Sequence, residues 1–327
     1  MRVGELGEQG LLRRLHQFCP PSMVGDDAAV LLVPEGQNLV VTTDALIDGV
    51  HFALGLTSDL VTMTPEDAGW RSVAANLSDL AAMGAEVMGI TVGLGLPASL
   101  PVSVVEGFYR GMVQGLSPHG GEILGGDVHR SPVVSLCITA LGRVAPHQVI
   151  RRSGAQVGDA IVVTGMHGRS RVGLELLLNP DLQAIAHGDA EPYLQAHRRP
   201  APRLDVVSLL HTLQVSAGMD SSDGLADAVL QICRCSGVGA HLRQAAIPKP
   251  RASWLSDEQA LQWALYGGED FELVLCLAPG KAEQLVQRVG GAAVVGSIAA
   301  GDDIYLIDDE GCIKQQLTLA QGFQHFA

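Results

Sequence analysis

Aspartates in short turn-like segments dominate the side chains that could do chemistry in this sequence. The segments fall where strands or helices are expected to begin or end: Gly25-Asp26-Asp27, Thr42-Thr43-Asp44, Asn76-Leu77-Ser78-Asp79, Gly125-Gly126-Asp127, Asp220-Ser221-Ser222-Asp223-Gly224 and Gly267-Gly268-Glu269-Asp270. Carboxylate and hydroxyl oxygens are the hard ligands that Mg²⁺ prefers. Glycines in such turns let a phosphate group approach the backbone N–H groups. The segments therefore predict a site for magnesium and a phosphorylated ligand.

Each segment also has a purely structural interpretation, because Asp and Gly are common turn residues. Asp220 and Asp223 are spaced to act as turn and N-cap residues of a following helix. Asn76 and Asp79, three residues apart, share one face of a helix, and that face could be solvated. The number of segments and their spread from residue 26 to residue 270 favour a common function. We expect a carboxylate cluster, supplied by both halves of the chain, that holds several magnesium ions.

Other nucleotide-binding and anion-binding motifs are weaker. The three lysines, Lys249, Lys281 and Lys314, all stand outside any GxxxxGK[ST] pattern, which excludes a P-loop. Residues 93–98 match GxGxxA formally, but a proline within them interrupts the helix start that a dinucleotide site needs. The turn at residues 165–170 suits either an anion on a helix N-terminus or an ordinary strand-to-helix connection.

Composition excludes two classes of partner. The 327 residues carry a formal charge of −14, from 35 acidic against 21 basic side chains. A nucleic-acid-binding face needs basic residues to neutralise phosphates, and an anionic membrane surface would repel this chain. The most apolar stretch, residues 133–141, is far shorter than the roughly 18 residues of a membrane span. We expect neither nucleic acid nor membrane among the partners.

The N-terminus and the cysteines indicate a compartment. The first five residues include Arg2 and Glu5 and lead into no apolar signal segment, so we expect no export. The six cysteines form no CxxC pair, and Cys233 and Cys235 are one residue apart. This spacing suits neither a zinc site nor a disulfide framework. A reducing, cytoplasmic location is the expectation.

Alternating strand and helix patterns position the acidic segments. In the first half we expect strands at 38–43, 86–96, 122–124 and 132–144, helices at 64–84 and 101–116, and a turn at 125–127. Thr64, Pro65 and Asp67 form a capping-box start for the first helix. In the second half we expect strands at 160–164, 271–277 and near 293 and 304, and helices at 203–213, from about 223, and at 280–289.

Two domains follow from the length and from one break in the pattern. At about 150 residues per domain, the chain is long enough for two. Proline and glycine cluster between residues 145 and 158, where the apolar patterning lapses. The prediction is an α+β fold with domains at residues 1–146 and 147–327.

Taken together, the segments resemble the thiamine-monophosphate kinase family, whose superfamily includes aminoimidazole ribonucleotide synthetase, selenophosphate synthetase and a hydrogenase maturation factor. The resemblance runs from Gly25-Asp26-Asp27-Ala28-Ala29-Val30 to Gly322-Phe323-Gln324-His325-Phe326. The Gly-Asp-Asp and Gly-Gly-Asp turns recur across the superfamily. The motifs at residues 44–52, 76–85, 220–225 and 267–273 are, in combination, specific to the kinases.

This resemblance implies a two-domain aminoimidazole ribonucleotide synthetase-like fold. The N-terminal α/β domain would bind ATP and magnesium and pair with a second copy into a dimeric β-barrel. The C-terminal α/β sandwich domain would complete the metal, ATP and substrate sites. The implied reaction is phosphorylation of thiamine monophosphate to thiamine diphosphate by in-line transfer from ATP, a phosphotransferase activity with a phosphate acceptor. Its implied requirements are ATP as co-substrate, several Mg²⁺ ions and a homodimer.

Roles for individual positions are likewise implied by the resemblance. The implied magnesium ligands, direct or through water, are Asp27, Thr42, Thr43, Asp44, Asp79, Asp127, Asp220 and Asp223. The implied ATP contacts are Gly126, Asp127, Arg152 and Ser222. His51, Glu269 and Phe323 would line the thiamine-phosphate pocket, although on spacing alone a residue such as His51 is more often structural than catalytic. Asp44, Asp127 and Arg152 are the implied catalytic residues.

Some departures and rival functions remain. Arg169 and Arg171 stand after Gly165 where relatives often have small residues, and Ser221 replaces a usual aliphatic residue. A selenophosphate synthetase-like or hydrogenase maturation factor-like enzyme is disfavoured, because those proteins usually carry a reactive N-terminal Cys or Sec or a C-terminal cysteine. A non-catalytic magnesium-nucleotide sensor on the same fold is the rival of a different class.

Overall fold

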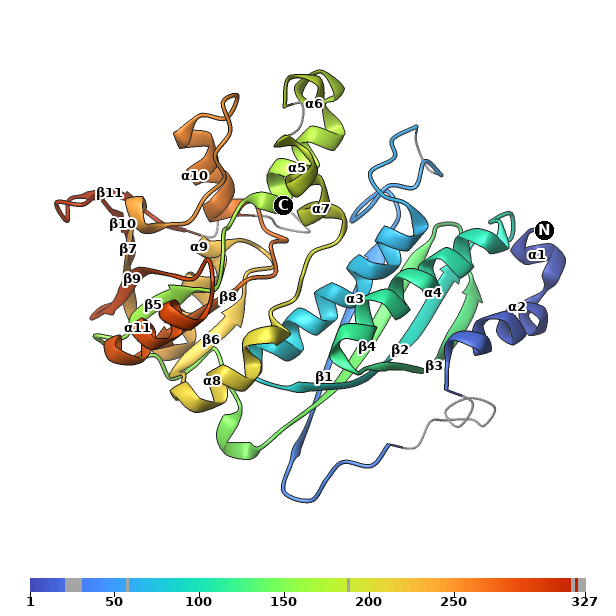
Figure 1. Ribbon diagram of the computed structural model, residues 1–327, viewed down its shortest axis with the longest axis horizontal. Helices are drawn as coiled ribbons and strands as arrows, with labels where there is room; N and C mark the ends of the chain where they lie inside the picture. The colour runs from blue at the N-terminus through green and yellow to red at the C-terminus, as the bar shows by residue number, and fades with distance from the viewer. Residues whose placement is uncertain (21–30, 57–58, 187–188, 319–320, 323–327) are drawn as a thin grey trace. The chain divides into compact units, whose positions relative to one another are not determined.

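Two units, each with its own sheet, make up the chain in the computed structural model (Figure 1). The structure describes residues 1–20, 31–56, 59–186, 189–318 and 321–322. The first unit comprises residues 1–80 and 85–146, and the second comprises residues 81–84 and 147–327.

The first unit is a four-stranded sheet with helices on one face. Its strands are β1 (Asn38–Ile47), β2 (Glu86–Leu96), β3 (Glu122–Arg130) and β4 (Ser135–Val144), in the order β1-β4-β2-β3. Its helices are α1 (Val3–Leu6), α2 (Glu8–Leu15), α3 (Pro65–Ala82) and α4 (Val102–Leu116), with the last two residues of α3 assigned to the second unit. Figure 1 shows α3 and α4 along the same face of this sheet.

The start and the packing of α3 follow from local sequence. The predicted capping box is confirmed: the Thr64 N–H donates to Asp67 Oδ2 at 3.2 Å, and the Asp67 N–H donates to Thr64 Oγ1 at 3.1 Å. A Cβ at Gly69 would lie 2.0 Å from the Phe108 carbonyl oxygen, and a Cβ at Gly111 would lie 1.9 Å from that of Glu66. Glycine therefore lets the backbones of α3 and α4 touch.

Two strands run further than predicted. β1 continues past Asp44 to Ile47, because β4 offers ten consecutive partners. The predicted turn at residues 125–127 is wrong, since β3 continues through it to Arg130. The glycines there accommodate a register shift against β2, and a Cβ at Gly126 would lie 1.9 Å from the Val92 carbonyl oxygen.

One face of the first sheet carries apolar side chains that remain exposed. Side chains alternate along a strand, so Leu39, Val41 and Thr43 point away from α3, while Thr42 and Asp44 point towards it. Leu39 and Val41 are 47% and 55% exposed. Leu39 and Val41 thus lie next to each other on this face as exposed apolar side chains.

The second unit is a seven-stranded sheet between two helical layers. Its strands are β5 (Ala160–Val163), β6 (Ala217–Asp220), β7 (Gly239–Arg243), β8 (Leu273–Leu277), β9 (Ala293–Ala299), β10 (Ile304–Ile307) and β11 (Ile313–Gln316), in the order β11-β10-β7-β9-β5-β8-β6. Its helices are α5 (Arg169–Leu178), α6 (Pro180–Ala186), α7 (Glu191–Arg198), α8 (Val207–Leu213), α9 (Leu225–Ser236), α10 (Asp257–Tyr266) and α11 (Pro279–Arg288).

Strand β5 shows how the layers are built. Ile161 and Val163 pack into a core with α9 and α10, whereas Ala160 and Val162 pack into a second core with α8 and α11. All four residues are buried, as expected of a strand covered on both faces. The predicted α+β architecture with a C-terminal α/β sandwich is therefore confirmed. Within the described part of the chain, no helix has the length and apolarity to cross a membrane.

Candidate functional site

The first group of predicted site residues lies between β1 and α3. Thr42 Oγ1 donates to Asp79 Oδ2 at 2.5 Å, and the Asp44 N–H donates to Asn76 Oδ1 at 3.0 Å. Among the strands that the structure describes, β1 is at the edge of the sheet, and the Asn76 side-chain oxygen accepts from its Asp44 N–H in place of a strand. The amide nitrogen of the same side chain donates to the Ser72 carbonyl oxygen at 2.9 Å, which fixes its orientation.

These contacts show that Asn76 and Asp79 lie on the side of α3 that faces β1. Asn76 is fully buried, and both side chains face β1, so this side of α3 is not a solvated face. Thr42 and Asp79 are hydrogen-bonded here, and strand alternation places the Asp44 carboxylate on the same face of β1 as Thr42. Such an all-oxygen, anionic donor set fits Mg²⁺.

Two other predicted residues, Thr43 and Asp127, lie on the opposite face of the same sheet. Thr43 points away from α3, where its hydroxyl contacts that of Thr139 at 2.8 Å. Asp127 of β3 pairs with Gly93 of β2, and Gly93 pairs with Cys137 of β4. Cys137 in turn pairs with Ala45 of β1, which lies two residues after Thr43. Asp127 therefore shares the Thr43 face, about 14 Å from β1 at three strand spacings.

Asp127 is also well exposed. Its side chain is 84% exposed, and its Oδ2 lies 3.7 Å from Nδ1 of His129. Gly126 precedes it in β3. In neither unit do three of the predicted carboxylates converge within 4.8 Å, among the residues that the structure describes. The predicted ligands thus form separate groups within the units.

His51 lies in the loop after β1 with a defined hydrogen bond. The Ile47 N–H donates to His51 Nδ1 at 3.1 Å. An Nδ1 that accepts carries no proton, so the neutral ring holds its proton on Nε2. His51 can therefore offer Nε2–H as a donor.

The second group of predicted residues lies where strands β5 and β6 end and strand β8 begins in the seven-stranded sheet. β8 is antiparallel to both β5 and β6, so the C-terminal ends of β5 and β6 meet the N-terminal end of β8. Asp220 ends β6 and is 3% exposed. The Glu269 N–H donates to the Ser222 carbonyl oxygen at 2.6 Å, which brings these two predicted residues together.

Asp223 is not the N-cap of the helix that follows. Gly224 occupies that position, at φ 101°, and a Cβ there would lie 2.6 Å from the Leu265 carbonyl oxygen. The exposed Asp223 side chain is therefore not required to cap α9. The Ser221 departure is accommodated, since its N–H and Oγ donate to the Glu272 carbonyl oxygen at 2.9 and 3.2 Å.

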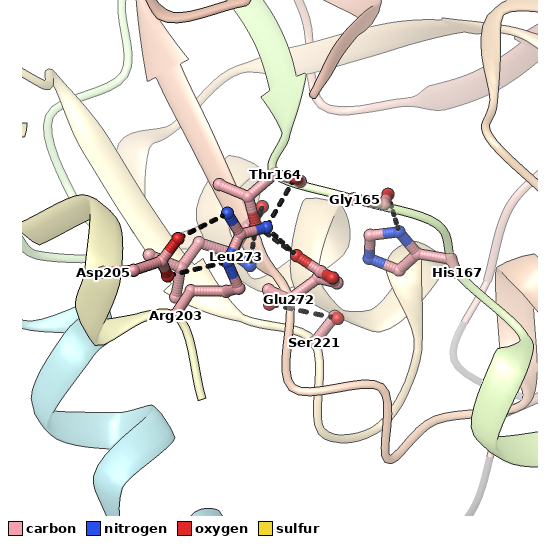
Figure 2. A network of polar contacts seen from close by, with 8 residues as sticks. All are labelled: Thr164, Gly165, His167, Arg203, Asp205, Ser221, Glu272 and Leu273. Carbon is pink, nitrogen blue, oxygen red and sulfur yellow. Dashed lines mark hydrogen bonds and ion pairs between the residues drawn. The ribbon is translucent and has the colours of Figure 1, made fainter. Parts of the chain in front are cut away.

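A polar network that was not predicted from the sequence links the residues at these strand ends (Figure 2). Glu272 Oε2 accepts from Thr164 Oγ1 at 2.6 Å and from Arg203 Nη1 at 2.8 Å. Arg203 Nη1 also donates to the Thr164 carbonyl oxygen, and its Nε and Nη2 bind the two oxygens of Asp205. Burial tends to lower the pKa of the Arg203 guanidinium, but Asp205 and Glu272 outweigh it and raise that pKa.

Buried His167 lies beside this network. Its side chain is fully buried, and Nδ1 lies 3.3 Å from the Gly165 carbonyl oxygen, so Nδ1 carries a proton and donates (Figure 2). Burial lowers the pKa of His167, which keeps the ring neutral. The only sequence signal for this network was the Gly165 turn and the Glu272 position in the 267–273 motif.

The N-terminus of α5 is occupied by the protein's own carboxylate. Asp270 Oδ2 accepts from the Gly168 N–H at 2.5 Å, and Oδ1 accepts from the Ser170 N–H at 2.9 Å. The turn at 165–170 therefore binds an anion, and that anion is Asp270. Burial raises the pKa of this carboxyl to about 7, against the two N–H donors, which lower it.

The two unusual arginines of this turn have local partners. Arg171 Nη2 pairs with Glu175 Oε2 at 2.8 Å along α5, and Arg169 Nη2 lies 3.5 Å from the Pro192 carbonyl oxygen. Arg152, in contrast, is exposed and hydrogen-bonds Gln231, six residues and about 9 Å along α9 from Leu225. Asp26, Asp27 and Phe323 lie outside the described residues.

Each of the two units matches a known protein family domain. Residues 25–144 match the N-terminal domain and residues 156–309 the C-terminal domain of AIR synthase related protein. A thiamine-monophosphate kinase of Synechococcus elongatus is 48% identical over 99% of this chain and 98% of its own length. The Escherichia coli thiamine-monophosphate kinase is 39% identical, covering 93% of this chain and 91% of its own.

Solved structures give the same result. The thiamine-monophosphate kinase of Stenotrophomonas maltophilia superposes with a TM-score of 0.79 at 32% identity, covering 90% of this chain and 95% of its own. A structure described as AaThiL complexed with AMPPCP and TMP has a TM-score of 0.74 at 28% identity, covering 97% and 98%. Hydrogenase maturation protein HypE, at 17% identity and a TM-score of 0.73, shares the fold. The chain belongs to the thiamine-monophosphate kinase family, within the AIR synthase related proteins.

Proposed function

We propose that this chain transfers the γ-phosphoryl group of ATP to thiamine monophosphate, giving thiamine diphosphate and ADP. The observation that carries the proposal is the 48% identity to a thiamine-monophosphate kinase along nearly the whole chain. The structure described with AMPPCP and TMP supports the same pair of ligands. The reaction consumes ATP, so we place it in the cytoplasm as part of this proposal.

The reaction requires neutralisation of phosphate charge more than it requires proton transfer. A phosphate monoester with a second pKa near about 6 is mostly dianionic at neutral pH and is already a nucleophile. The obstacle is repulsion between two anions, about 4 kcal/mol per charge pair at 4 Å for an effective dielectric of about 20. Magnesium, when bound, supplies the neutralising charge and aligns the in-line displacement. This requirement explains why a phosphate-transferring chain can be so acidic.

We assign the chain's own residues to this task as follows. Thr42, Asp44 and Asp79 supply oxygen ligands from β1 and α3, and Asp220 and Asp223 supply them from the second unit. Asp27, Thr43 and Asp127 complete the proposed ligand set. Ser222, Gly126 and Arg152 contact ATP, with Arg152 adding positive charge near the phosphates. His51, Glu269 and Phe323 contact thiamine monophosphate, with His51 donating from Nε2.

Measuring both products of one reaction mixture tests the proposed reaction. Purified chain, ATP, Mg²⁺ and thiamine monophosphate should yield thiamine diphosphate and ADP in equal amounts, measured by chromatography. Omitting Mg²⁺ or adding excess EDTA should abolish both products. ADP without thiamine diphosphate would indicate a different acceptor, and ATP binding without either product would indicate a magnesium-nucleotide sensor.

We also propose that two copies of the chain pair through the open face of the first sheet. Its exposed Leu39 and Val41, and the position of Thr43 and Asp127 on the same face, support an interface next to site residues. A dimeric β-barrel is the arrangement that the family resemblance implies.

Replacing Val41 by arginine tests this pairing. A charge placed in an apolar interface core is strongly unfavourable, so Val41→Arg should elute as a monomer where the wild type elutes as a dimer. Light scattering coupled to size exclusion measures both masses. Val157→Arg, at a residue 61% exposed in the second unit, is the matched control and should remain dimeric. A dimeric Val41→Arg variant would place the interface elsewhere.

A further inference from the structure

The loop that leads into β8 has an unusual backbone. Gly268, Glu269 and Phe271 have φ angles of 66°, 60° and 53°, in the left-handed region. Among the described residues only three non-glycine residues have positive φ, and two of them are here. Side chains other than glycine rarely adopt this conformation, because Cβ then approaches the following carbonyl oxygen. Such backbone persists only where the surroundings impose it, and it is concentrated at functional sites.

Separate contacts impose this conformation. The Glu269 N–H is held by the Ser222 carbonyl oxygen at 2.6 Å. Glu272 is held by Thr164 and Arg203 through its side chain and by Ser221 through its carbonyl oxygen. Between these two residues, the Asp270 carboxylate accepts from the N–H groups of Gly168 and Ser170.

The contact of Asp270 differs from the others in kind. It joins the loop to the N-terminus of α5, whereas Thr164, Ser221 and Ser222 lie just after strands and Arg203 lies before α8. The carboxylate lies on the positive end of α5, where two N–H groups favour the charged form. Burial opposes that charge, and Arg169 and Glu272 act on the carboxyl in opposite directions. The contact therefore holds the loop to α5 through the side chain of the residue that follows Glu269.

We propose that Asp270 is a positioning residue that fixes Glu269 in its left-handed conformation and thereby sets the affinity for thiamine monophosphate. The Ser222 contact holds the N–H of Glu269 itself and the Asp270 contacts hold the next residue, so together they fix the backbone from which the Glu269 carboxylate extends. The inference rests on the proposed function, in which Glu269 contacts thiamine monophosphate. The thiazolium ring of that substrate is cationic, so a rigid carboxylate is a fitting partner.

Asp270→Asn and Asp270→Ala test the proposal. The asparagine keeps one acceptor oxygen and the alanine keeps none. Losing a hydrogen bond to a charged group weakens an interaction by about 10- to 100-fold, so the KM for thiamine monophosphate should rise by about that factor in Asp270→Ala, and by less in Asp270→Asn. The KM for ATP and the kcat should change less than about threefold, because uniform substrate binding is what is lost.

Asp308→Asn is the matched control. Asp308 Oδ1 also accepts two backbone N–H groups, those of Glu310 and Cys312, in a turn of the same unit. It should leave both KM values unchanged. Calorimetric binding of thiamine monophosphate to each variant should reproduce the KM differences, and circular dichroism should confirm that each is folded at the assay temperature.

The outcomes are separable. A general loss of folded protein lowers kcat and leaves both KM values unchanged, which would reduce Asp270 to a structural residue. Equal effects on the KM for ATP and for thiamine monophosphate would also overturn the inference. If the wild-type chain forms no thiamine diphosphate, the proposed function fails instead, whatever the variants do.

Discussion

Arg203→Met is expected to lower the free energy of unfolding by about 3–5 kcal/mol, the range for breaking a buried ion pair from one side. The side chains of Arg203 and Glu272 are only 13% and 14% exposed. Removing the guanidinium leaves the Glu272 carboxylate away from water with the Thr164 hydroxyl as its remaining side-chain donor in the network (Figure 2). Urea unfolding followed by circular dichroism measures the change.

A second substitution separates charge from packing. Adding Glu272→Gln to Arg203→Met removes the uncompensated charge, so the double variant should be more stable than Arg203→Met alone. Glu175→Gln is the control, because it weakens a more exposed i, i+4 pair with Arg171 on α5, with side chains 23% and 35% exposed, and should cost about 0.3–0.5 kcal/mol. An Arg203→Met variant within 1 kcal/mol of the wild type, or a double variant less stable than the single one, would contradict a stabilising role for the pair.

Local signals predicted the elements that depend on neighbouring residues. The start of α3 was predicted because a capping box is complete within four residues. The helix α10 was missed although its signal is of the same kind, since Ser256 Oγ accepts from the Gln259 N–H at its N-terminus. The two glycines of β3 were misread as a turn, because only the pairing with β2 shows that they accommodate a register shift.

The sequence predicted which candidate residues share a helix face or a turn, but not how they contact one another. Spacing placed Asn76 and Asp79 on one helix face, but only the pairing with β1 shows that this face is buried. Strand alternation places Thr42 and Thr43 on opposite faces of the sheet, which separates two residues that the motif lists side by side. Asp270 and the α5 N-terminus are about 100 residues apart, and no local pattern predicts a contact over that range.

Asp44→Asn is expected to reduce phosphoryl transfer by about 10²- to 10³-fold, the range for losing one preorganised electrostatic contact in an active site. Asparagine has the same shape, and the Asp44 backbone N–H that bonds Asn76 is retained, so β1 should keep its register and the variant should unfold like the wild type. A neutral amide is a weaker ligand for Mg²⁺ than a carboxylate.

The Mg²⁺ dependence identifies the cause of the loss. Turnover of Asp44→Asn, measured as thiamine diphosphate formed at saturating ATP and thiamine monophosphate, should rise with Mg²⁺ at concentrations where the wild type is already saturated. Asp257→Asn, which neutralises a 74% exposed carboxylate at the start of α10, should keep wild-type turnover and Mg²⁺ dependence. Wild-type turnover by Asp44→Asn would remove Asp44 from the proposed metal ligands. A loss of turnover that Mg²⁺ does not alleviate would assign Asp44 a role other than binding the metal.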